Sequence, residues 1–448
     1  MLGRPQDRTP ESDVERTSRL TPITFDSHEA WLPVEHPLHR PRHGGRQLTA
    51  LLCAAVFFVV PALAMVAGVR APEIENHALA SFPSPLDGWA FFGGMSDWAT
   101  DNLPFRDSAI RAADDISRGV FAEPPPSDNS PRGQLQVPLA PTATTPPSQP
   151  DEPSVAAGFP KVIEGKQGWL YLGFDIQGKC RPLQPMDDIV SNLRRVRDAV
   201  ERSGRRFVLV VPPDKSTVVT EFLPDTYVGK ACAQAASRRF WQRLSTEVGV
   251  LDLRANLQGI TEAGGGPPYR QIDTHWDDRG ALMMVRRLAD RLEPGITAGW
   301  KVTPERVNQY RADLPKMLGR DGYGDVQVYS LSPDGRQDRT RVPVSDLRSP
   351  VNLRASAVDG MVGTSVGILS DSFILATTRY LPAAFAAVDV VFYNSLEADP
   401  AATLDVITRN DVVVFEVVER NLASGLATLI EPEMVDLVVR HLDANPRR

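Results

Sequence analysis

A single uncharged apolar run near the N-terminus constrains this chain more than any other feature of the sequence. The run covers residues 48–69 and reads LTALLCAAVFFVVPALAMVAGV. A helix rises about 1.5 Å per residue, so a run of this length spans the roughly 30 Å hydrocarbon core of a bilayer. A cleaved signal peptide is the alternative, but the apolar part is long for such a peptide and starts late in the chain. We therefore expect a retained transmembrane helix that anchors the chain in a lipid bilayer.

The charges beside this run predict its orientation. Arginines occupy positions 40, 42 and 46 on the N-terminal side, whereas Glu73 and Glu75 follow soon after the run. Cytoplasmic flanks of membrane helices carry an excess of Lys and Arg, so the N-terminus is expected in the cytoplasm. The predicted location is a cell membrane, crossed once, with the C-terminal part of the chain extracytoplasmic.

Composition divides the rest of the chain into unlike segments. Residues 1–47 are rich in His, Pro, Arg and Ser without a countable period, which predicts a disordered cytoplasmic tail. Residues 122–158 hold a dense share of the chain's 39 prolines among Ser, Thr and Ala, the composition of an extended linker. A membrane-proximal segment over 71–121 and a main domain over 159–448 remain.

Charge and cysteine content exclude several classes of function. The formal net charge is −7, so no nucleic-acid partner is expected, because phosphate backbones are bound by clustered Lys and Arg. The sequence contains no compact Cys or His ligand spacing, so neither a metal nor a cofactor is expected. Cys180 and Cys232 fall on the predicted outer side, where oxidation is permitted. A disulfide between them is expected, and two separate buried thiols are the alternative.

The main domain alternates apolar strands with amphipathic helices. Residues 187–203 place apolar side chains at steps of three or four, and the continuous apolar run FVLVVP follows at 207–212. Further apolar strands are predicted at 366–370, 388–393 and 412–418. This alternation predicts an α/β fold, a three-layer α/β/α domain around a mostly parallel sheet. In such sheets, reactive groups gather in loops at the carboxyl ends of the strands.

Two short segments at such positions carry residues suited to acyl transfer. Asp273 and His275, in Asp-Thr-His-Trp, precede a helix predicted from Arg279, and Ser372 follows the strand 366–370 in Ser-Asp-Ser-Phe. Together they supply a nucleophile, a general base and a carboxylate to orient the base. The alternative is structural, because Ser and Asp are preferred helix N-caps and a lone His more often has a structural role.

Seven short motifs, taken in order, resemble those of the alginate O-acetyltransferase family of SGNH-hydrolase-like proteins, the AlgJ/AlgX type. They are EIENHALASFP (73–83), DNLPFRDSAI (101–110), VIEGKQGWLYLG (162–173), VVPPDKSTVVTEFLP (210–224), QIDTHWDDRGA (271–281), ILSDSFI (368–374) and FEVVERNL (415–422). The family shares the order seen here, with Asp273 and His275 before Ser372, which is the reverse of ordinary SGNH hydrolases. Ser370 is a departure, since the family often has Gly at that position.

The resemblance implies a role for each member of the suspected triad. Ser372 is expected to be the nucleophile that accepts an acetyl group, and its backbone N–H the first oxyanion donor. His275 is expected to be the base that takes the serine proton. Asp273 is expected to fix the imidazole tautomer and stabilise the imidazolium.

Three further residues are candidates for substrate contact. Trp276 lies next to His275 and is a candidate for stacking on a sugar ring, with core packing as the alternative. Asp214 and Lys215 follow a predicted strand end and are candidates for a polar ligand, with an ion pair as the alternative.

The expected function is that of a membrane-anchored, extracytoplasmic O-acetyltransferase acting on a cell-envelope or secreted polysaccharide. The resemblance also implies a multi-spanning acyltransferase in the membrane as the source of acetyl groups. An acetyl-polysaccharide esterase with the same three residues is one alternative, because water and a sugar hydroxyl compete for the same acyl-enzyme. A non-catalytic glycan-binding subunit is the other.

Overall fold

The computed structural model describes residues 45–69, 82–88, 90–102, 104–105 and 158–447. Residues 1–44 of the tail expected over 1–47, nearly all of the proline-rich linker and most of the membrane-proximal segment lie outside the described residues. The chain divides into two compact units, Met1–Arg70 and Ala71–Arg448.

The first unit contains one long helix, α1 (Gly45–Val66), with Pro61 inside it. Its segment Leu48–Met65 is long and apolar enough to cross a membrane. These are properties of length and composition, and a signal sequence has them too.

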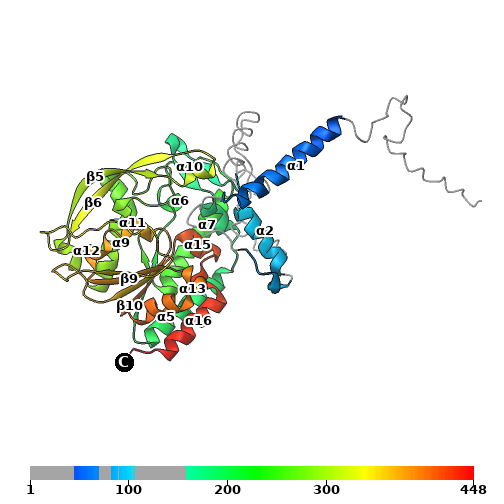
Figure 1. The fold of residues 1–448 in the computed structure, drawn as a ribbon. Coiled ribbons are helices and arrows are strands. Elements are labelled where there is room, and N and C mark those ends of the chain that lie inside the picture. The colour runs from blue at the N-terminus through cyan, green and yellow to red at the C-terminus, as the bar shows by residue number, and fades with distance from the viewer. Residues whose placement is uncertain (1–44, 70–81, 89, 103, 106–157, 448) are drawn as a thin grey trace, which may run out of the picture. The chain divides into compact units, whose positions relative to one another are not determined.

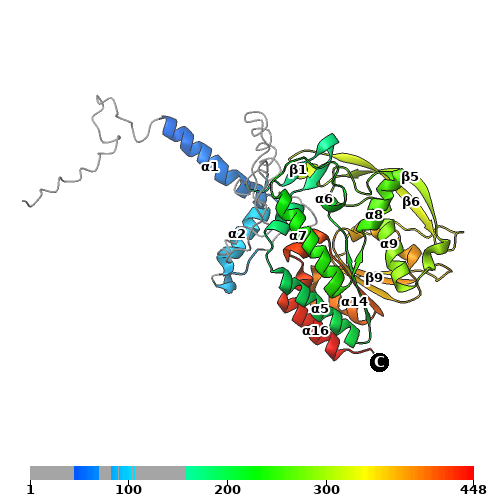
Figure 2. The ribbon, with the colours of Figure 1, turned by 180° about the vertical axis from the view of Figure 1, so that it is seen from behind.

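The second unit is built on a six-stranded sheet in the order β4-β3-β10-β8-β9-β7 (Figures 1 and 2). The strands are β3 (Arg206–Val211), β4 (Val250–Asp252), β7 (Val351–Arg354), β8 (Val366–Ser370), β9 (Ala387–Phe392) and β10 (Val412–Glu416). Five of them pair in parallel, and the edge strand β7 runs antiparallel to β9. The α/β class and the mostly parallel sheet are therefore as predicted.

Helices cover both faces of this sheet, which explains why its central strands read as continuous apolar runs. In β3, Val208 and Val210 enter one core, whereas Leu209 and Val211 enter the other. The first core includes the apolar face of α9 (Asp278–Leu292). The second includes α5 (Met186–Arg202) and α16 (Pro432–Ala444), which lie side by side in both views (Figures 1 and 2).

The second unit contains further α-helices. They are α2 (Ala90–Asn102), α4 (Phe174–Cys180), α6 (Lys215–Val218), α7 (Lys230–Arg243), α8 (Arg254–Ile260), α10 (Leu314–Met317), α11 (Ile374–Thr377), α12 (Leu381–Ala384), α13 (Ser395–Ala398), α14 (Pro400–Thr408) and α15 (Glu419–Ser424). The helical stretch predicted after Ser372 is thus divided into α11 and α12. Pro382 lies in the first turn of α12, where its missing N–H costs least.

Two antiparallel strand pairs were not predicted from the sequence. One is the hairpin of β1 (Val162–Glu164) and β2 (Leu170–Leu172), and the other is the ribbon of β5 (Lys301–Arg311) and β6 (Tyr323–Ser332). Most of β5 is exposed, and its sequence, KVTPERVNQYR, lacks a regular alternation of apolar and polar residues. Without a buried face, no period of two marks it as a strand.

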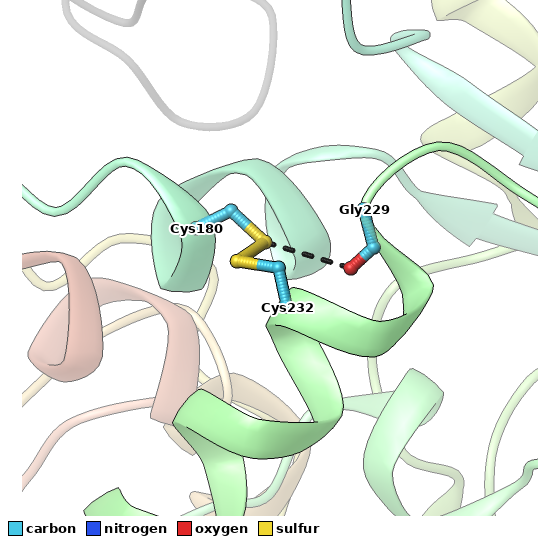
Figure 3. The surroundings of a disulfide bond; sticks show 3 residues. All are labelled: Cys180, Gly229 and Cys232. Atoms are coloured by element: carbon cyan, nitrogen blue, oxygen red, sulfur yellow. Dashed lines mark hydrogen bonds between the residues drawn. A yellow bond between two sulfur atoms is a disulfide. The ribbon is translucent and has the colours of Figure 1, made fainter. Parts of the chain in front are cut away.

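A disulfide between Cys180 and Cys232 joins two helices of the second unit (Figure 3). Cys180 ends α4, and Cys232 lies in the first turn of α7. The Cys180 sulfur lies 3.5 Å from the carbonyl oxygen of Gly229. The two cysteines are 52 residues apart in sequence, so the bridge closes a long loop of the unfolded chain.

Loss of this bridge is expected to destabilise the second unit. Closing a loop of this size lowers the entropy of the unfolded chain, which corresponds to about 2–4 kcal/mol of stability. The Cys180→Ser/Cys232→Ser variant should therefore unfold at a lower temperature than the wild type, as measured by thermal denaturation of the detergent-solubilised chain. Cys53→Ser is the matched control, because Cys53 is an exposed free thiol on α1. Equal melting temperatures for wild type and double variant would contradict this prediction.

Candidate active site

The strand β8 ends in a tight turn that carries Ser372. Asp371 fixes this turn, because its two carboxylate oxygens accept hydrogen bonds from the backbone N–H groups of Phe373, at 3.0 Å, and Val418, at 2.7 Å. Val418 follows β10, the neighbouring strand in the sheet. The turn after one strand is thereby tied to the end of the next.

The backbone around Ser372 suits an oxyanion site. The side chain of Asp371 accepts from the N–H groups of Phe373 and Val418, and the N–H of Ser372 donates no hydrogen bond within the described part of the chain. Ser370, where the family often has Gly, is fully buried and donates its hydroxyl to the carbonyl of Val391 on β9 at 3.2 Å. Its side chain therefore points into the sheet and leaves the turn unobstructed.

A loop before α9 carries Asp273 and His275. Asp277 ends the loop as the N-cap of α9, where its side chain accepts from the N–H of Arg279 at 2.8 Å. Within the loop, the backbone N–H of His275 donates to Asp273 Oδ1 at 3.0 Å, and the carbonyl of His275 accepts from the N–H of Arg270 at 3.1 Å. These bonds hold the Asp273 and His275 side chains toward one another.

The structure brings Asp273, His275 and Ser372 into one hydrogen-bonded chain. His275 Nδ1 lies 2.8 Å from Asp273 Oδ1, and His275 Nε2 lies 2.9 Å from Ser372 Oγ. Because an ionised carboxylate only accepts hydrogen bonds, Nδ1 carries the proton and Nε2 is left to accept from the serine hydroxyl. This is the protonation pattern that a general base for a serine nucleophile requires.

The surroundings keep Asp273 ionised. Burial alone would raise the pKa of Asp273, but the hydrogen bond and the charge of His275 outweigh it and hold this pKa below its ordinary value. The side chain of Asp273 is 5% exposed, whereas that of His275 is 22% exposed. The carboxylate is thus shielded while the imidazole remains open to solvent and substrate.

Asp313 is a site residue that the sequence analysis missed. It lies between β5 and α10, and its backbone N–H donates to Asp273 Oδ2 at 3.2 Å. Its carboxylate accepts from the N–H of Thr274, at 3.0 Å, and from the Thr274 hydroxyl. One of its oxygens also lies 3.6 Å from His275 Nδ1. Burial and the charge of Asp273 together raise the pKa of Asp313.

Asp273, His275 and Asp313 are also the described residues whose donor atoms come close enough to hold a cation, all within 4.8 Å of one another. Their polar atoms already pair within the chain, His275 with Asp273 and Asp313 with Thr274. We therefore describe these residues as a hydrogen-bonded cluster.

The three residues considered for substrate contact all lie in the interior. The ring of Trp276 is fully buried, and its indole N–H donates to the carbonyl of Phe373 at 3.0 Å. The stacking role expected for it is therefore replaced by the core-packing alternative. Asp214 and Lys215 are 0% and 1% exposed, so neither can contact a polymer in solvent.

Asp214 forms buried ion pairs, which was the alternative to a role in ligand binding. It lies 2.8 Å from the ammonium of Lys179 and 3.4 Å from the guanidinium of Arg420. Lys179 also pairs with Glu419 at 3.0 Å. Burial alone would lower the pKa of Lys179, but the charges of Asp214 and Glu419 raise it above its ordinary value. Asp175, 3.7 Å from Arg420, completes this buried charge cluster.

Comparison with known proteins bears on residues 162–367, which match the family model described as "SGNH hydrolase-like domain, acetyltransferase AlgX". The match includes Asp273 and His275 and ends shortly before Ser372.

Two curated relatives carry the name "Probable alginate O-acetylase AlgJ". The protein from Pseudomonas syringae pv. tomato is 26% identical over 221 residues, which cover 46% of this chain and 54% of the relative. The protein from Pseudomonas putida is 25% identical over 192 residues, which cover 42% and 49%. The chain thus spans about half the length of the curated relatives it matches.

Among solved structures, the O-acetyltransferase domain of Pseudomonas putida AlgJ is similar at a TM-score of 0.42 and 18% identity, covering 62% of this chain and 98% of that domain. The family match and the names of the curated relatives agree with the family that the motifs resemble. Residues 162–367 therefore match an AlgX-type model of SGNH hydrolase-like domains, as the motifs predicted.

Proposed function

We propose that this protein is a membrane-anchored, extracytoplasmic O-acetyltransferase that acetylates a polysaccharide through an acyl-enzyme on Ser372. The observation that carries the proposal is the hydrogen-bonded chain from Asp273 through His275 to Ser372. The family match over 162–367 and the names of the curated relatives support the class of reaction and the class of acceptor.

The first half of the proposed reaction loads the enzyme. His275 Nε2 takes the proton of Ser372 as Oγ attacks the acetyl carbonyl, and the resulting imidazolium is balanced by the ionised Asp273. The backbone N–H of Ser372 donates to the oxyanion of the tetrahedral intermediate. The bond to the donor's leaving group then breaks, and that group receives the proton from His275.

The second half transfers the acetyl group. A sugar hydroxyl gives its proton to His275 Nε2 and attacks the acetyl carbon, and the bond to Ser372 Oγ breaks as the serine regains a proton. Water can make the same attack, which yields free acetate instead of an acetylated glycan. Exclusion of water by the bound acceptor is therefore what separates a transferase from an esterase at this site.

The proposed location follows from α1. Its apolar segment is long enough to anchor the chain, and the arginines before it favour a cytoplasmic N-terminus. The second unit would then lie on the outer side of the membrane, away from the cytoplasmic acetyl donor. A multi-spanning membrane acyltransferase is accordingly the proposed source of acetyl groups.

Substitution of the triad tests the reaction directly. The purified full chain in detergent is incubated with an activated acetyl ester, with and without a polysaccharide acceptor, and acetate and acetylated glycan are measured. Ser372→Ala and His275→Ala are expected to lower the rate at least about a thousandfold, because each removes an essential member of one catalytic unit.

Ser370→Ala is the matched control for these substitutions, because this second serine of the same motif bonds to Val391 and not to His275. It should keep most of the activity. Acetate without acetylated glycan would point to an esterase. Unchanged turnover in Ser372→Ala would remove the basis of the proposal, and a folded wild type that turns over no ester would favour the glycan-binding alternative.

The acid side of the pH–rate profile is expected to respond to Asp273. This carboxylate stays charged down to low pH, because its pKa is held below the ordinary value, so its own protonation does not set the acid side of the profile. Asp273→Asn removes the charge that stabilises the imidazolium, so the acid limb should move to lower pH while the plateau falls at least about a hundredfold. The profile of kcat/KM between about pH 4.5 and 8 provides the measurement. A limb that stays in place would contradict the role of Asp273.

A further inference from the structure

Lys215 is a buried cation for which the proposed chemistry has no use so far. It opens α6 directly after β3, and it is 1% exposed. Its ammonium lies over the rings of Trp169 and Tyr171, 5.6 and 5.2 Å from their centroids. In the described part of the chain, no carboxylate forms an ion pair with it at 4.0 Å or less. A buried ammonium without such a partner is costly, so its presence calls for an explanation.

The hydrogen bonds of Lys215 all run to the loop that carries the triad. Its Nζ donates to the carbonyl oxygens of Arg270 at 3.0 Å, Gln271 at 3.2 Å and Asp273 at 2.6 Å. An ammonium has three protons to donate, and here all three have carbonyl acceptors in one short segment. Lys215 therefore fixes the backbone from which the Asp273 side chain reaches His275.

The positive charge of Lys215 offsets negative charge on two carboxylates of the site, Asp273 and Asp313. Asp273 and Asp313 both lie beside the imidazole of His275, at 2.8 and 3.6 Å from Nδ1. Two ionised carboxylates beside one neutral ring repel each other, and the raised pKa of Asp313 reflects this repulsion in addition to burial. With the ammonium present, the group carries one net negative charge, which a single imidazolium neutralises during acyl transfer.

We propose that Lys215 is a positioning residue of the acyl-transfer site, a buried cation that holds the 270–273 loop by its carbonyl oxygens and balances the two carboxylates beside His275. The inference rests on the proposed acyl-transfer function. It assigns Lys215 no contact with substrate, because its side chain lies in the interior.

The charge on Lys215 is itself sensitive to pH. Burial lowers the pKa of Lys215 to about 8, against the opposing effect of Asp313, Asp273 and Asp175. The rings of Trp169 and Tyr171 face it from the hairpin strand β2 and the residue before it. The wild-type rate should consequently fall as the pH rises through about 8, because the ammonium is lost.

The stability of the fold should change in the opposite direction. An unfolded lysine has a pKa of about 10.4, so between about pH 8 and 10 the unfolded chain binds more protons than the folded chain at this position. Stability contributed by Lys215 therefore rises with pH in this window. A wild type that gains stability relative to a variant without the charge, while losing activity, is the signature of a functional buried cation.

Two substitutions separate the hydrogen bonds of Lys215 from its charge. Lys215→Gln keeps a side-chain N–H donor and removes the charge, whereas Lys215→Met removes both. Lys166→Met is the matched control, because Lys166 is a half-exposed lysine paired with Asp225. The full chain in detergent is assayed for acetyl-ester turnover and for labelling of Ser372 by a fluorophosphonate, which requires the nucleophile and base but no acetyl transfer.

Lys215→Met is expected to lower kcat about a hundredfold, the effect of a misplaced catalytic group, and to leave KM within about twofold. The kcat of Lys215→Gln should lie between those of Lys215→Met and the wild type. Its labelling rate should not decline above about pH 8. The control should match the wild type in both assays. The free energies of unfolding of the wild type and Lys215→Gln are also measured between pH 7 and 10, to test the predicted change of stability with pH.

Several results would overturn the proposal. Wild-type labelling rates and pH profiles in both Lys215 variants would do so, as would a loss of rate that merely follows a loss of stability with the alkaline limb intact. If Lys215→Met does not fold, Lys215→Gln and the wild-type alkaline limb still decide the matter. Folded wild type that neither turns over ester nor labels at Ser372 would instead contradict the proposed function.

Discussion

The hydrogen bond between His275 Nε2 and Ser372 Oγ joins two segments that lie 97 residues apart, and much of the domain serves to hold its two ends. The residue after each partner makes a second link, because the buried indole of Trp276 donates to the carbonyl of Phe373, and the two rings meet edge to face at 5.2 Å between centroids. A fully buried hydrogen bond of this kind is costly to leave unmade. This buried hydrogen bond ties the loop of His275 to the turn of Ser372.

The parallel sheet explains why these segments meet at all. Because β8 and β10 are parallel neighbours, Asp371 after one strand reaches the backbone N–H of Val418 after the other. Glu416, the last residue of β10, accepts from the backbone N–H of Asp371 at 3.1 Å. Burial and the charge of Asp371 raise the pKa of Glu416 well above its ordinary value. The turn after β8 is thus held by hydrogen bonds to groups at the end of the adjacent strand β10.

The sequence predicted the elements whose physical signal is strong. Continuous apolar runs placed β3, β8, β9 and β10 within two residues of their observed bounds, because strands buried on both faces carry little else. Asp273, His275 and Ser372 were candidates because they flank strand and helix ends in an α/β pattern. Asp313 carried no such signal, since it follows an exposed ribbon strand and contacts the site only through tertiary folding.

Burial decides between the two interpretations of the charged motif residues, a polar ligand or an ion pair. Asp214 and Lys215 are adjacent in the sequence, yet their side chains contact different groups.

Asp214 joins Lys179 and Arg420, and Lys215 binds the carbonyls of the 270–273 loop. Local sequence cannot distinguish these from surface charges, because the compensating partners come from distant segments. Charges fixed in this way need not reorganise when His275 becomes an imidazolium, and preorganisation of that kind is how an active site stabilises developing charge. The short step from Asp214 to Lys215 therefore links a structural charge cluster to the site of the proposed chemistry.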